Sequence, residues 1–171
     1  MDSIENSNVE DTVFKGKFRR DDINFYNSEI IRIQKSKGIF GIQLDERRIA
    51  SKNAIRRSKV YLPSKKRRLR RKSLLIWRQI QHCAEILNSK QLPCWNIQAV
   101  GSDFDGIVNP IKGLWTSENI EPIREYLIFH ANNFLKANKH RLLSQNNISA
   151  QEITHKVLTD NALTFIKHHL N

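Results

Sequence analysis

Two short apolar runs with a helical segment between them constrain this chain more than any other feature. Residues 39–44 and 96–100 are rich in β-branched and other apolar side chains, and an aspartate or a glycine follows each run directly. Two strands joined by a crossover helix should pair in parallel. Because a parallel sheet is normally buried on both faces, this pattern predicts an α/β fold that needs more than two strands.

Helix patterns accompany both strands and follow the second one. Each has apolar residues three or four positions apart, and three of the four begin with a residue that can cap the first turn. The clearest is the capping box Ser149-x-x-Glu152, in which hydroxyl and carboxylate satisfy each other's end-of-helix amides. The predicted helices cover residues 24–36, 74–88, 116–136 and 149 to at least 166. Residues 1–18, polar and without periodicity, are expected as a lead-in to one domain, 19–171.

The positive charge of the chain is concentrated in one segment. The chain has 29 Lys and Arg against 17 Asp and Glu, a formal net charge of +12. Residues 49–84 contain twelve basic and no acidic residues, so the remainder is balanced. We expect a basic loop at about residues 47–73. A nucleic-acid-binding arm on a neutral body would have this distribution, and so would an enzyme with one basic loop.

The segment able to carry chemistry is Gly-Ser-Asp-Phe-Asp-Gly, residues 101–106, directly after the second strand. Parallel strands present functional groups at their carboxyl ends. Asp103 and Asp105 are the candidates, since a carboxylate there can ligate a divalent metal or carry a proton to a leaving group. A turn rich in aspartate and glycine without a catalytic role would have the same sequence.

Further motifs stand in a fixed order around this turn. Residues 99–106 form a short apolar run with the hexapeptide, and Leu44-Asp45-Glu46-Arg47-Arg48 follows the first strand. The other matching stretches are 28–31, 38–42, 109–114, 149–153 and 160–163. In this order they resemble the last two strands and the closing helices of the renal or membrane dipeptidases, which are zinc enzymes of the amidohydrolase group built on a TIM barrel. The resemblance covers roughly residues 20–45 and 74–169.

The resemblance implies roles for three residues. Asp103 would lie at the metal centre as the catalytic proton shuttle, and would be a metal ligand only in a complete barrel; Asp105 would be structural. Arg20 lies close to the position of an arginine that grips the substrate carboxylate, and is the substrate-binding candidate. The family's other zinc ligands have no counterpart here, and the six histidines do not replace them. His82 is interpreted as a packing or hydrogen-bonding residue.

The resemblance therefore implies an α/β fold in the form of an incomplete TIM barrel, its last two strands with their helices. The function expected is that of a C-terminal fragment of a zinc-dependent dipeptidase. One aspartate cannot hold zinc usefully, so we expect the chain alone to bind no cofactor and to be inactive. A truncated product, a misassigned reading frame and half of a split enzyme all fit. In the last case an N-terminal chain would complement this one, and the complete enzyme would take a dipeptide or related amide.

Two other functions remain open. The alternative is a basic nucleic-acid-binding protein that uses residues 49–84. Only Tyr61 is interleaved as a stacking aromatic in its most basic run, 56–72, and nucleic acid is not the expected partner. Residues 103–106 also match the Asp-x-Asp-Gly of haloacid-dehalogenase-type phosphatases. Ile107 stands where that family usually has threonine.

Composition also bears on location. No apolar run approaches the roughly 18 residues needed to cross a bilayer, and the acidic first residues are unlike a secretory signal. Cys83 and Cys94 suit neither a disulfide framework nor a zinc knuckle, so both are expected as small buried residues. We therefore expect a cytoplasmic protein without a membrane span.

Overall fold

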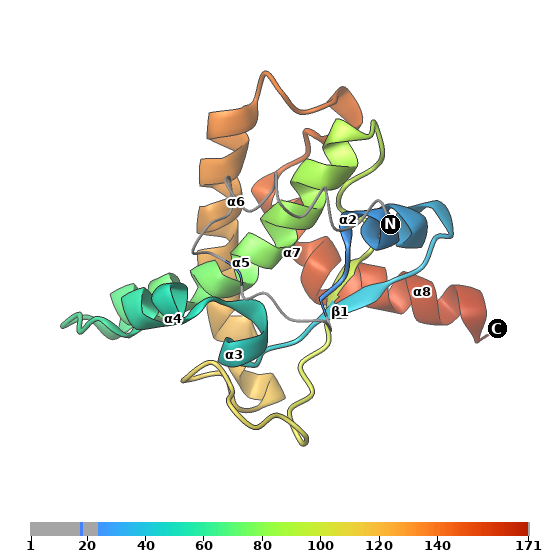
Figure 1. The fold of residues 1–171 in the computed structure, drawn as a ribbon. Helices are drawn as coiled ribbons and strands as arrows, with labels where there is room; N and C mark the ends of the chain where they lie inside the picture. Colours follow the sequence, from blue (N-terminus) through green and yellow to red (C-terminus); the bar gives the residue numbers. More distant parts are fainter. Residues whose placement is uncertain (1–17, 19–23, 171) are drawn as a thin grey trace.

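A pair of three-residue strands lies among helices in the computed structural model (Figure 1). The structure describes residue 18 and residues 24–170. Residues 1–17 of the expected lead-in lie outside this range, and so does the candidate Arg20.

The two strands predicted from the sequence are present and parallel. Strand β1 (Phe40–Ile42) pairs with β2 (Gln98–Val100), with Gly41 opposite Ala99. The two backbones come very close just past the end of β2, where a Cβ added to Gly41 would lie 2.8 Å from the Cα of Gly101. Only glycine at both positions allows this approach.

Helices make up most of the described chain. The α-helices are α2 (Asn27–Lys35), α3 (Glu46–Ile49), α4 (Lys52–Lys59), α5 (Lys65–Ser89), α6 (Arg124–Asn138), α7 (Ala150–His155) and α8 (Asn161–His169). Shorter 3-10 turns are η1 (Ser117–Asn119), η2 (Glu121–Ile123) and η3 (Ser144–Asn146), and η4 (Lys156–Asp160) is a π-turn. Half of the predicted capping box is present at α7: Ser149 Oγ accepts the N–H of Glu152 at 3.1 Å, but the Glu152 carboxylate does not accept the N–H of Ser149 in return. Ser51 and Ser64 accept equivalent bonds at α4 and α5.

The long helix α5 forms one wall of the core. Its Trp77 meets Trp95, which precedes β2, at 6.5 Å between ring centroids, and Phe134 of α6 lies 6.0 Å from each ring. All three side chains are buried. Large aromatic surfaces dominate the energetics of such a core, so this cluster fastens α5 and α6 to the chain entering β2.

The expected fold class is wrong. The structure is 61% helix and 5% strand, with one two-stranded sheet among the described residues, so it is not an incomplete TIM barrel. Helix packs on helix through most of the core, since α5 lies against α2 and α6, and α6 lies against α7. The outer edge of β2 is closed by a helical residue, because Asn161 Nδ2 donates to the Gln98 carbonyl at 2.8 Å.

Residues 47–73, expected as a loop, form α3, α4 and the first turns of α5. Lysine and arginine favour helix, and serine caps start both α4 and α5. Pro63 lies in the bend between these two helices. The buried side of α4 consists of Ala54 and Ser58. Such small residues form no long apolar stripe, so the sequence pattern does not indicate this helix.

Two buried asparagines tie the chain around β2 to distant segments. Asn161 Nδ2 donates to the carbonyls of Trp95 and Gln98, at 2.8 Å each. Asn146 Oδ1 accepts the N–H of Cys94 at 3.1 Å. These bonds set where β2 lies against the C-terminal helices, because each joins residues far apart in the sequence.

Replacing Asn161 with aspartate should lower the free energy of unfolding by about 2–4 kcal/mol, since two buried carbonyls lose their donor and face a carboxylate instead. Denaturant unfolding measures this change. Asn133→Asp, at an exposed position of α6, is the matched control and should shift stability by less than about 0.5 kcal/mol. Similar losses of stability in the two variants would contradict the role of the Asn161 amide as donor to two buried carbonyls.

His130 of α6 is buried against α5. Its Nε2 lies 3.2 Å from Ser73 Oγ and 3.0 Å from the carbonyl oxygen of Arg70. Burial lowers the pKa of His130 most; the Arg70 carbonyl raises it, and the charges of Arg70 and Arg78 lower it further. The folded protein therefore resists protonation at a histidine that the unfolded chain protonates readily.

Stability should therefore fall as the pH is lowered through about 6.5, the ordinary histidine pKa, because the unfolded chain then binds a proton that folded His130 does not. His130→Gln should flatten this part of the profile between about pH 7.5 and 5. Denaturant unfolding at a series of pH values provides the measurement. The exposed His140→Gln should leave the slope unchanged, and an unaltered slope in His130→Gln would refute the assignment.

Candidate functional site

Asp103 lies three residues beyond β2, at the carboxyl end of the strand pair. Gln43 follows β1 directly, and its Nε2 donates to Asp103 Oδ2 at 3.0 Å. The carboxyl ends of the two strands thus meet through side chains 60 positions apart in the sequence. The Asp103 side chain is exposed, so its carboxylate can reach a molecule outside the chain.

The backbone around Asp103 forms a tight turn. Asp103 has a φ of 55°, the left-handed region that costs an L-residue about 1–2 kcal/mol, somewhat less for aspartate. Its carbonyl accepts the N–H of Gly106 at 3.1 Å. A Cβ on Gly106 would lie 2.6 Å from Asp103 Oδ1, so this glycine leaves room for the carboxylate. Strained backbone of this kind concentrates at functional sites.

Asp105 lies exposed in the same turn. Among the described residues it forms no hydrogen bond or ion pair. The described chain therefore gives no contact that would support the structural role expected for it.

Two buried carboxylates, Asp45 and Glu46, lie beside the site and were not among the site residues predicted from the sequence. Asp45 Oδ2 accepts the N–H of Asn109 at 3.2 Å. Glu46 Oε1 accepts the N–H of Lys112 at 3.4 Å, and its Oε2 pairs with Lys59 Nζ at 2.9 Å. These bonds fasten the loop after β1 to the loop after β2. In the sequence, the signal for this connection is the pair of adjacent acids directly after the first strand.

The described residues do not by themselves form the zinc site expected for the complete family enzyme. No group of three His, Cys, Asp or Glu side chains comes together to hold a metal ion within residues 18 and 24–170. His82, interpreted as a packing residue, contacts the ring of Phe18 with 5.1 Å between centroids. The absence of a bound cofactor in the isolated chain stays a prediction.

Both cysteines are free and buried, which confirms their interpretation as small core residues. Burial raises the pKa of each thiol to about 12. Since the thiolate is the reactive form, neither Cys83 nor Cys94 is a nucleophile at neutral pH.

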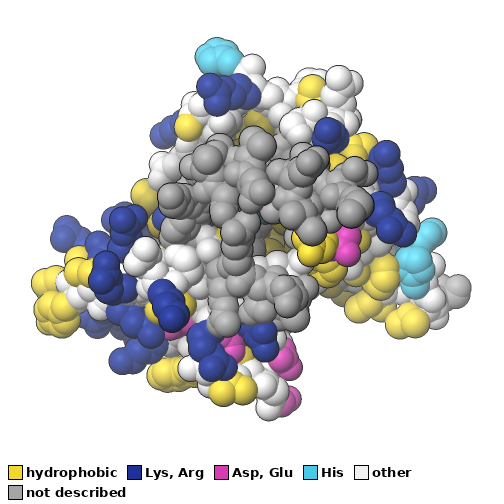
Figure 2. Space-filling view, in the orientation of Figure 1, with side chains coloured by type: hydrophobic (Ala, Val, Ile, Leu, Met, Phe, Trp, Pro, Cys, Tyr) yellow, Lys and Arg dark blue, Asp and Glu magenta, His cyan; other side chains and the backbone are white. Residues whose placement is uncertain are grey.

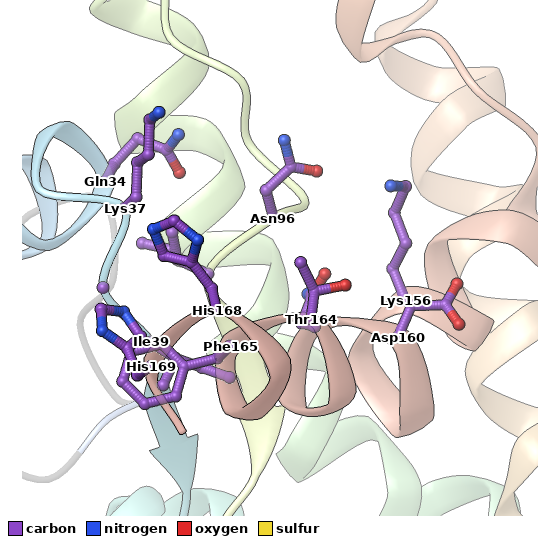
Figure 3. Close-up of a pocket in the computed structure, with 13 residues that line it drawn as sticks. Gln34, Lys37, Ile39, Asn96, Lys156, Asp160, Thr164, Phe165, His168 and His169 are labelled. Carbon is purple, nitrogen blue, oxygen red and sulfur yellow. The ribbon is translucent and has the colours of Figure 1, made fainter. Parts of the chain in front are cut away.

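A pocket of about 520 Å³ lies at the other ends of the strands. Figure 3 shows Phe165, His168 and His169 of α8 across from Lys37 and Ile39, which precede β1. Asp103 does not line it, so this pocket is separate from the candidate site.

Comparison with protein-family models, curated proteins and solved structures finds no match to this chain. None of the described helices combines the length and apolar character needed to cross a membrane.

Two substitutions at Asp103 distinguish the effect of its backbone conformation on stability from the effect of its carboxylate. Asp103→Ala and Asp103→Gly both lose the bond to Gln43, but only alanine keeps a Cβ at positive φ. The alanine variant should therefore be less stable than the glycine variant by about 1 kcal/mol, as measured by denaturant unfolding. Greater stability of the alanine variant would contradict the left-handed conformation.

Proposed function

We propose that this chain contributes the aspartate-bearing part of a dipeptidase-type hydrolase and is inactive alone. The observation that supports the proposal most is the Asp103 carboxylate, held by Gln43 at the carboxyl end of a parallel strand pair.

The role proposed for Asp103 is to accept a proton from the attacking water, whose oxygen bonds to the carbonyl carbon of a dipeptide or related amide. Asp103 then passes this proton to the leaving amine as the C–N bond breaks. Gln43 donates to Oδ2, which fixes the orientation of the carboxylate. Oδ1 lies over Gly106, which has no side chain to cover it. A fixed, accessible carboxylate oxygen is what proton transfer to a bound substrate requires.

The remaining groups of the site must come from outside the described residues, because these contain no metal-binding cluster. In the complete enzyme a zinc ion would supply the electrophilic chemistry, held by residues other than those described. A complementing chain with the family's other ligands is therefore part of the proposal. So is a cytoplasmic location, which two free, buried thiols support.

The test is complementation. This chain is co-produced with the part of a renal-type dipeptidase that precedes its own Gly-Ser-Asp-Phe-Asp-Gly segment, and chelator-sensitive dipeptide hydrolysis is measured. Neither part alone should be active, whereas the pair should be. Asp103→Asn should lower kcat by about 10²–10⁴-fold, and Asp105→Asn, which alters the exposed neighbour, by less than about threefold.

Failure of complementation, or the wrong pattern among the variants, would contradict the proposal. Complementation fails if the pair co-purifies but stays inactive, or does not associate at all. The pattern is wrong if Asp103→Asn and Asp105→Asn have equal effects. Dipeptide hydrolysis by this chain alone would show that the isolated chain is not inactive, contrary to the proposal.

A further inference from the structure

A strongly basic helical hairpin projects from one side of the molecule. It consists of α4, the bend at 60–64 and the first two turns of α5 (Figure 1). Residues 52–72 hold eleven Lys and Arg and no Asp or Glu. Figure 2 shows dark blue side chains gathered over this hairpin, with apolar side chains at its outer end. Val60 and Tyr61, in the bend, are 54% and 79% exposed.

Part of this charge holds the hairpin together. Arg68 Nη1 donates to the carbonyl of Leu62 at 2.6 Å, and Arg71 Nη1 donates to that of Arg57 at 3.2 Å. Lys59 pairs with buried Glu46. These bonds close the bend and join the hairpin to the loop after β1, so the hairpin is built into the fold.

Two further cations are also engaged, since Lys72 Nζ donates to the Lys112 carbonyl at 2.8 Å and the Arg70 guanidinium lies 4.7 Å from the centroid of the Phe129 ring. The remaining six make no such contact. Their side chains are exposed, and none forms a hydrogen bond or ion pair with another described residue. They are Lys52, Arg56, Arg57, Lys65, Lys66 and Arg67. Six uncompensated cations on one rigid hairpin form a binding surface for a polyanion.

The basic residues also destabilise the first turns of α5, in which several of them lie. The first turn of α5 has basic residues and no acidic one, although a helix N-terminus favours negative charge by about 0.3–1 kcal/mol per group. Lys66 and Arg70, and likewise Arg67 and Arg71, repel each other at four-residue spacing. A bound polyanion would relieve both effects, so the hairpin should become more stable on binding.

We propose that this hairpin binds nucleic acid through the phosphate backbone. Arginine guanidinium groups pair with phosphate in bidentate geometry. An anionic membrane fits less well, because it requires an apolar face beside the cations. Here Ala54, Ile55 and Leu69 pack inward against the core, and the exposed apolar residues Val60 and Tyr61 lie only in the bend at the tip. This surface does not include Asp103, so the result of one test does not decide the other proposal.

The experiment measures binding of the whole chain to a labelled 20-base-pair duplex by fluorescence anisotropy between 50 and 200 mM salt. Six phosphate contacts should give a slope of log K against log salt of about −5, and a loss of roughly 10³-fold over this range. Lys65→Gln/Lys66→Gln/Arg67→Gln should reduce the slope by about 3. The duplex should also raise the Tm of the unaltered chain.

The matched control is Lys136→Gln/Lys139→Gln/Arg141→Gln, which removes the same charge at the exposed far end of α6. It should leave slope and affinity nearly unchanged. Equal effects of the two triple variants would mean that only net charge acts, and would overturn the proposal. Absence of binding at 50 mM salt, or tighter binding to phosphatidylserine vesicles than to the duplex, would overturn it as well.

Discussion

The close approach of β1 and β2 is the constraint on which the rest of the structure depends. With glycine at 41 and 101 the two backbones touch, and the hydrogen bond from Gly101 N–H to the Ile42 carbonyl, at 3.1 Å, extends the pairing past the end of β2. The chain enters the pair from α2 and from α5, and leaves it toward the basic hairpin and toward the turn at 101–106. Both proposed surfaces are therefore positioned by the same six-residue pair.

The loops beyond the strands extend this framework. Asp45 and Glu46 bind backbone groups of the loop at 109–112, and Glu46 also pairs with Lys59 of α4. The candidate aspartate and the hairpin thus belong to one connected body, although they face different ligands in the two proposals. Burying two carboxylates is tolerable only because each accepts hydrogen bonds.

The sequence predicted local features well and the assembly poorly. The strands, their parallel pairing and the Ser149 cap follow from short-range patterns. The fold class was wrong because three-residue strands flanked by long helices produce the same apolar pattern as strands of a larger sheet. The helices within 47–73 were missed because small residues such as Ala54 and Ser58 make their buried side. The bonds of Gln43 and Asn161 were not predictable, since each depends on a partner at least 60 positions away.

Amide hydrogen exchange at Gly101, followed by NMR, tests the strand pair most directly. The Gly101 and Phe40 amides donate to the Ile42 and Ile97 carbonyls across the pair. Both should therefore exchange as slowly as amides in the middle of α5. Exchange at Gly101 as fast as at exposed Asp105, while α5 stays protected, would show that the strands do not hold the molecule together.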